Sequence, residues 1–137
     1  MISKGSQVHK RISIAQFTGL LQSLGYRARI IRPDLVSSAS DGMEWCVELW
    51  PEGEAETLVF KSELIVAHDP VADINKFLRF CPDVVPTYEK SEDDGCWQLT
   101  ITTVRSLVGG VTLDHISTWV ECWVKGLEWA TESLFVP

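Results

Sequence analysis

Apolar residues recur at helical spacing near both ends of the chain. Near the N-terminus, Ser13 and Gln16 match a capping box, and Gly25 is the expected stop. The apolar positions between them predict a short helix with one apolar face: Ile14, Phe17, Leu20, Leu21 and Leu24. Near the C-terminus, Thr112 is the expected cap of a long amphipathic helix. Its apolar stripe is Leu113, Ile116, Trp119, Val120, Trp123, Leu127, Ala130 and Leu134.

A third helix is predicted in the middle of the chain. Asp69 is a capping residue, and Pro70 suits the first turn of a helix. Pro82 is the expected stop. The apolar positions of this helix are Val71, Ile74, Phe77, Leu78 and Cys81.

Alternating apolar and polar residues predict the strands. They cover residues 26–32, 43–50, 57–66 and 84–90, and a last strand starts at residue 97. Residues 33–42 are rich in turn formers and are predicted to form a loop. The predicted order is αβββαββα, an α+β fold in which helices pack on an antiparallel sheet of about five strands.

The length of 137 residues indicates one domain. Residues 1–12 are expected to form a flexible N-terminal arm, and residues 13–137 a single α+β domain. No apolar run approaches the length of a membrane span, and the N-terminus lacks a signal-peptide core. The expected location is therefore cytoplasmic, without membrane association.

The net charge of −7 is unevenly distributed. Residues 1–32 contain six basic and no acidic residues, whereas the remainder contains six basic and 19 acidic residues. An acidic body repels phosphate backbones, which argues against nucleic acid as a partner. The basic segment suits an acidic partner, the protein's own acidic surface or simple solvation.

The sequence contains no motif of a catalytic site. Phosphate-binding, dinucleotide-binding, serine-hydrolase and zinc-protease signatures are all missing. The cysteines have no metal-binding spacing and are expected to be buried free thiols: Cys46, Cys81, Cys96 and Cys122. We therefore expect no catalytic residues, no enzyme activity and no organic cofactor.

Acidic residues crowd the predicted loops and hairpins. Calcium takes six to eight oxygen ligands in flexible geometry, which clustered carboxylates can supply. The calcium candidates are Asp34, Asp41, Glu52, Glu54, Glu56, Glu92, Asp93 and Asp94. Solvated hairpin tips are the alternative interpretation of the same residues.

Trp129 falls outside the apolar stripe of the last helix. An exposed indole beside small residues would leave a shallow apolar patch, typical of a partner or dimer contact. The predicted interface consists of Cys122, Gly126, Trp129 and Ser133. The alternative is that the helix end or the N-terminal arm covers Trp129.

The succession of elements resembles the YbjN family, which shares the type III secretion chaperone-like fold. The segments that carry the resemblance are DINKFLRF at 73–80, PTYEKSEDDG at 86–95, the strand WQLTI that follows, and GGVTLDHISTWV at 109–120. The resemblance implies an antiparallel sheet with packed helices, often dimeric, and a regulatory or chaperone-like role. Acidic cyanobacterial calcium-binding proteins are similar.

Two functional hypotheses follow. The first is a non-catalytic cytosolic regulatory or chaperone-like domain that binds a protein partner or itself as a homodimer. The second is an acidic calcium-binding buffer or sensor.

Overall fold

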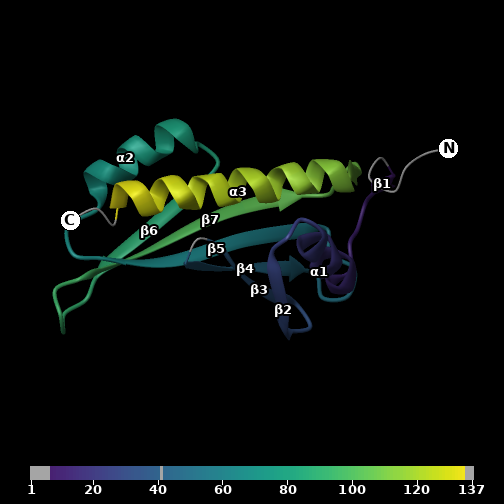
Figure 1. The fold of residues 1–137 in the computed structure, drawn as a ribbon, viewed down its shortest axis with the longest axis horizontal. Helices are drawn as coiled ribbons and strands as arrows, with labels where there is room; N and C mark the ends of the chain where they lie inside the picture. Colours follow the sequence, from purple (N-terminus) through teal and green to yellow (C-terminus); the bar gives the residue numbers. More distant parts are fainter. Residues whose placement is uncertain (1–6, 41, 135–137) are drawn as a thin grey trace.

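A computed structural model describes residues 7–40 and 42–134, apart from the side chains at 80, 133 and 134. Its three helices are α1 (Ile14–Ser23), α2 (Val71–Phe80) and α3 (Leu113–Leu134). The strands of the main sheet are β2 (Arg27–Arg32), β3 (Leu35–Ser40), β4 (Met43–Trp50), β5 (Thr57–Val66), β6 (Val85–Lys90) and β7 (Trp97–Ser106). Short strands β1 (Val8–His9) and β8 (Val111–Thr112) form a separate pair (Figure 1).

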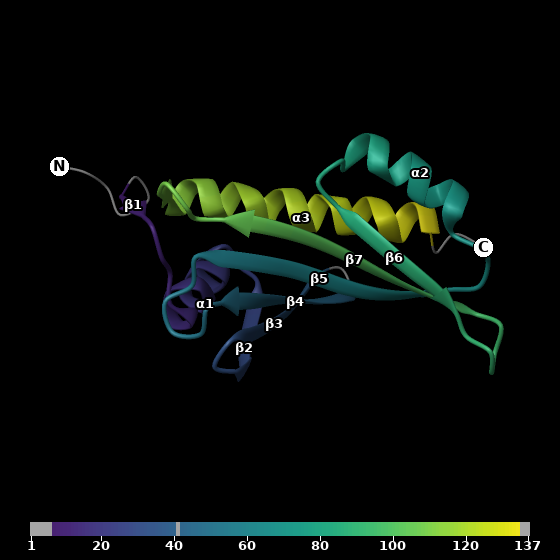
Figure 2. The same ribbon diagram turned by 180° about the vertical axis from the view of Figure 1, so that it is seen from behind.

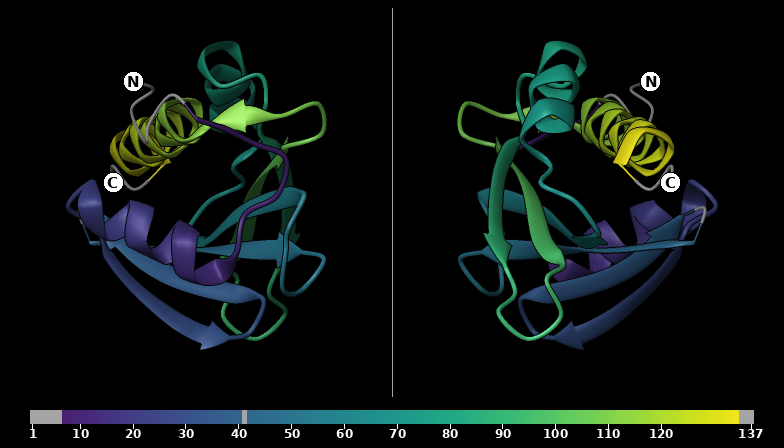
Figure 3. Two further views of the ribbon diagram at one scale, coloured as in Figure 1. Left: turned by 90° about the vertical axis from the view of Figure 1, so that its right-hand side faces the viewer. Right: turned by 90° about the vertical axis from the view of Figure 1, so that its left-hand side faces the viewer.

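The main sheet has six strands in the order β2-β3-β4-β5-β7-β6, and every neighbouring pair is antiparallel. The sheet is curved, with α1 and α3 inside the curve and α2 beside α3 at its rim (Figure 3). The predicted α+β class and antiparallel pairing are confirmed.

The prediction of a loop over residues 33–42 and of about five strands is wrong, because β3 lies within that segment. Its serines are common turn residues, which explains the error. Strand β3 nevertheless pairs with β2 on one side and β4 on the other. Val36 and Ser38 face the core, and the Ser38 hydroxyl donates a 2.6 Å hydrogen bond to the Arg27 carbonyl. Long-range pairing thus overrides local preference.

The helix ends follow the predicted capping residues with one difference. Ser13 and Gln16 form both hydrogen bonds of the capping box, and the Thr112 hydroxyl accepts a 3.1 Å bond from the His115 N–H. Helix α2 begins at Val71, so Pro70 is its N-cap residue and not part of its first turn. The Asp69 carboxylate accepts the Val71 N–H at 3.0 Å, as a capping residue would.

Part of the segment predicted as an arm, residues 8–12, makes contacts with the rest of the domain. Val8 and His9 pair with Thr112 and Val111 in the β1–β8 ladder. Ile12 is fully buried and exchanges backbone hydrogen bonds with Ala55. Burial of this isoleucine anchors the segment beside the β4–β5 connection.

The core lies between the helices and the inner face of the sheet. On β5, Leu58, Phe60 and Leu64 are buried, whereas the alternate residues point to the other face. The Phe60 ring meets Phe17 of α1 at 6.3 Å and Trp123 of α3 at 5.7 Å between centroids. One strand thereby holds both helices. No helix in the described part of the chain is long and apolar enough to cross a membrane.

Loss of the Phe60 ring should destabilise the whole domain. We expect Phe60→Ala to lower the free energy of unfolding by about 3–5 kcal/mol, from lost burial and the cavity left behind. Urea denaturation measures this change. The matched control is Ile65→Ala, which removes an exposed side chain from the same strand and should change the value by less than about 0.5 kcal/mol. Equal effects would contradict the assignment of the two faces.

Candidate functional site

The outer face of the main sheet is not covered by any helix of the described chain (Figure 3). Side chains on this face come from alternate residues of each strand. The register places Val59 of β5 directly opposite Val104 of β7. Trp50 of β4 and Val85 of β6 lie one diagonal step away on either side. These four residues form a continuous apolar row across four strands.

The apolar row is largely open to solvent. Trp50, Val85 and Val104 expose 54%, 58% and 56% of their surface, and Val59 is half-buried. Scattered apolar residues on a surface are ordinary, but a contiguous exposed group is typical of a binding site. The sequence shows the apolar residues of this row, but only the register of four strands shows that they adjoin.

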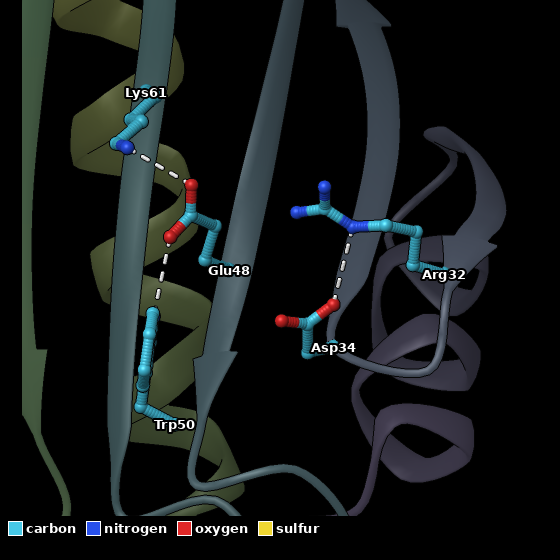
Figure 4. Close-up of polar contacts among 5 residues, drawn as sticks. All are labelled: Arg32, Asp34, Glu48, Trp50 and Lys61. Atoms are coloured by element: carbon cyan, nitrogen blue, oxygen red, sulfur yellow. Dashed lines mark hydrogen bonds and ion pairs between the residues drawn. The ribbon is translucent and has the colours of Figure 1, made fainter.

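Trp50 is held in place by a charged pair beside the row. Its indole N–H donates a 3.2 Å hydrogen bond to one carboxylate oxygen of Glu48, and the Lys61 ammonium donates a 2.9 Å bond to the other (Figure 4). A second ion pair, Arg32 to Asp34 at 3.3 Å, joins the end of β2 to the β2–β3 turn. An indole fixed in this way loses little side-chain entropy when a partner covers it.

The contacts of Glu48 with Lys61 and Trp50 also favour the charged form of its carboxylate. The hydrogen bond from Lys61 lowers the pKa of Glu48, partial burial opposes that shift, and the hydrogen bond from Trp50 adds to it. Glu48 is therefore charged at neutral pH and keeps both donors engaged. This arrangement orients an apolar anchor and offers no activated nucleophile.

A groove is lined by residues of α2, α3 and strand β7, and we call it the α2–α3 groove. Figure 2 shows where these three elements lie. The volume of the groove is about 390 Å³. Phe77 of α2 and three tryptophans of α3, Trp119, Trp123 and Trp129, supply most of its apolar wall.

Arg105 brings charge to the α2–α3 groove. One guanidinium nitrogen donates a 2.9 Å hydrogen bond to Asp83, and the guanidinium carbon lies 6.0 Å from the centre of the Trp119 ring. The Nε of Arg105 and the indole nitrogen of Trp123 are buried without a hydrogen-bond partner. Each unpaired buried donor costs about 1–3 kcal/mol.

Three of the four predicted interface residues line this groove: Cys122, Gly126 and Trp129. The expectation of an exposed Trp129 is wrong, because α2 packs against it with the Phe77 ring 5.3 Å away between centroids. Gly126 is buried, and a methyl group there would lie 3.3 Å from the Cys81 sulfur. Cys122 is exposed. The side chain of Ser133 lies outside the described residues.

The calcium candidates are not brought together. Asp34 pairs with Arg32, and Glu56 pairs with Arg11. Glu52 and Glu54 lie in the β4–β5 connection, whereas the β6–β7 turn carries Glu92, Asp93 and Asp94. These regions lie at opposite ends of the ten-residue β5–β7 ladder, about 30 Å apart. Asp41 lies outside the described residues. In residues 7–40 and 42–134, no three His, Cys, Asp or Glu side chains could hold a metal ion.

The four cysteines are free thiols, as predicted, but they are less buried than expected. Cys122 is exposed, and the other three, Cys46, Cys81 and Cys96, are half-buried. Burial is the main cause that raises the pKa of the Cys46 and Cys81 thiols. Both thiols are therefore protonated at neutral pH, which does not suit a nucleophile.

Comparisons with known proteins identify the fold. No protein-family model and no curated protein sequence matches the chain. The crystal structure of YbjN from E. coli, described as a proposed transcription regulator, matches with a TM-score of 0.64 at 16% sequence identity. The match covers 93% of this chain and 92% of YbjN. The chain therefore has a YbjN-like fold, which confirms the resemblance expected from the sequence.

The Glu48 contacts should contribute modestly to stability, in a pH-dependent way. We expect Glu48→Gln to lower the free energy of unfolding by less than about 1 kcal/mol at about pH 7. The folded pKa lies below the ordinary value of 4.5, so the contribution is present above pH 4.5 and is lost as the pH falls through the folded pKa.

Urea denaturation of both proteins at about pH 7 and about pH 3 measures this effect. The two proteins should differ at the higher pH and converge at the lower one. Glu44→Gln, an exposed change on the same face of β4, is the control and should have no effect. A difference that persists at low pH would show that the charge of Glu48 is not its cause.

Proposed function

We propose that this protein is a non-catalytic regulatory or chaperone-like domain of the cytoplasm that binds a protein chain through the apolar row. The observation that carries the proposal is the continuous exposure of Trp50, Val104 and Val85 on a sheet face that no described helix covers. Tryptophan is the residue type most enriched among residues that dominate binding energy, and this one is held in place before binding. The YbjN-like fold supports a regulatory role through the description of YbjN itself.

A second copy of the chain is the occupant that the charges of this face favour. Arg27 and Arg29 of β2 point outward and have no ion-pair partner in the described residues. Glu63 of β5 and Glu89 of β6 point outward toward the opposite edge of the sheet. A two-fold axis parallel to the strands would place β2 of one copy over β6 of the other, with Arg27 level with Thr87 and one diagonal step from Glu89.

This proposal predicts a dimer that a charge in the row disrupts. We expect Val104→Lys to weaken self-association at least about tenfold, because dimerisation would bury an unpaired ammonium. Sedimentation velocity distinguishes the 15.4 kDa monomer from its dimer. The matched control is Val108→Lys, the same change at a valine that is 74% exposed and lies outside the row. A wild-type protein that stays monomeric at about 100 µM would contradict self-association.

A charge swap tests the orientation of the two copies. Arg27→Glu alone should weaken the dimer, and Arg27→Glu combined with Glu89→Arg should restore it, because the pair is then reversed across the interface. If the double variant is weaker than either single one, the strand-parallel axis is wrong. A photoreactive residue at position 104 that crosslinks only to a different protein would assign the row to another partner.

Calcium binding, the second hypothesis from the sequence, has little support in the positions of the described carboxylates. The carboxylates at the two ends of the β5–β7 ladder would have to act separately, and each turn alone offers few of the six to eight oxygens that calcium prefers. We therefore expect calorimetric titration to show no more heat with calcium than with magnesium. A saturable calcium signal that Asp93→Asn with Asp94→Asn removes, and that Glu52→Gln with Glu54→Gln leaves intact, would place a site at the β6–β7 turn.

A further inference from the structure

The α2–α3 groove is sized for a small molecule. Its volume of about 390 Å³ falls in the range of about 300–1,000 Å³ found for ligand pockets. A chain of about ten carbon atoms is of suitable size for such a pocket.

The wall of the groove is apolar along most of its length. Phe77, Trp119, Trp123 and Trp129 present aromatic rings from two helices, and Ile101 of β7 adds an aliphatic side chain. Such a surface attracts an apolar body and excludes water from it.

The charged residues of the lining carry a net positive charge. Arg105 and Lys125 carry two positive charges against the single negative charge of Asp83. Asp83 engages Arg105 through one hydrogen bond, and its own side chain is 61% exposed. A guanidinium has five N–H donors, so Arg105 keeps the capacity to bind a second carboxylate.

Unpaired donors give an independent indication of an acceptor. Trp123 is 5% exposed, and its indole N–H has no partner in the described structure. The Nε of Arg105 is also buried and has no hydrogen-bond partner among the described residues. Both residues line the groove, so the two unpaired donors lie within its wall. An acceptor oxygen reaching this part of the wall would satisfy what the protein alone does not.

We propose that the α2–α3 groove binds a small apolar molecule that ends in a carboxylate, with the carboxylate at Arg105 and the apolar body along the aromatic wall. The groove is separate from the apolar row, so this inference does not depend on the proposed protein contact.

Three probes with the same ten-carbon chain test the proposal: decanoate, decan-1-ol and decyltrimethylammonium. Tryptophan fluorescence follows the titration, because Trp119, Trp123 and Trp129 line the groove, and calorimetry gives the stoichiometry. We expect one decanoate per chain with a dissociation constant below about 1 mM. The alcohol should bind at least about tenfold more weakly, and the cation should not bind.

Variants assign the site. Arg105→Met keeps an apolar stem and removes the donors, so it should weaken decanoate at least about tenfold and leave the alcohol unchanged. Cys122→Trp fills the groove from an exposed position and should weaken both ligands. Lys125→Met removes the other cation without touching the Arg105–Asp83 pair, and should weaken decanoate by a smaller factor. Arg79→Met, an exposed change on α2 that does not line the groove, is the matched control.

Three results would overturn the proposal. Equal binding of decanoate and decanol, unchanged in Arg105→Met, would mean apolar partition alone. Binding that survives Cys122→Trp would place the site elsewhere. If decanoate does not bind with a dissociation constant below about 1 mM, the groove is not a carboxylate-binding site. The monomeric Val104→Lys protein should bind decanoate like the wild type, so a failure of the dimer proposal would not affect this result.

Discussion

The rest of the structure depends on the packing around the buried ring of Phe60. That ring lies near the middle of the sheet and meets Phe17 from the first helix, Trp123 from the last and Trp45 from the neighbouring strand. Aromatic rings bury large areas, and their tilted and edge-on contacts add to the stabilisation from burial. The curve of the sheet closes around this group, so both helices are placed on the same side and the opposite side is left bare.

Alternate residues of strand β5 therefore belong to two different surfaces, the core and the outer face of the sheet. Phe60 points into the core, whereas Val59 and Lys61 on either side of it point outward to the apolar row and its charged support. A shift of register by one residue would exchange these sets, so the core fixes the register that assembles the row. The α2–α3 groove is formed differently, because α2 rests against α3 and leaves space above the end of β7. The two candidate surfaces thus depend on separate packing contacts.

Local signals explain what the sequence could predict and what it could not. The capping residues Ser13 and Thr112 and the regular apolar spacing identify α1 and α3, because a helix satisfies its hydrogen bonds within one segment. Strand β3 escaped prediction because its serines favour turns and its pairing partners lie elsewhere in the chain. The apolar row depends on the register of four strands, which local sequence signals do not show. The burial of Trp129 depends on the packing of α2 against α3, which is likewise a tertiary contact.

The pairing of β1 with β8 has a consequence for how the protein is made. Val8 lies beside Thr112, so one of the first ordered segments is completed only when one of the last strands has been synthesised. Contacts between such distant parts of a chain slow folding, because a long loop must close before they form. Strand β8 leads directly into α3, which covers the core. During synthesis, the part of the inner face that α3 covers therefore stays exposed until α3 has emerged from the ribosome.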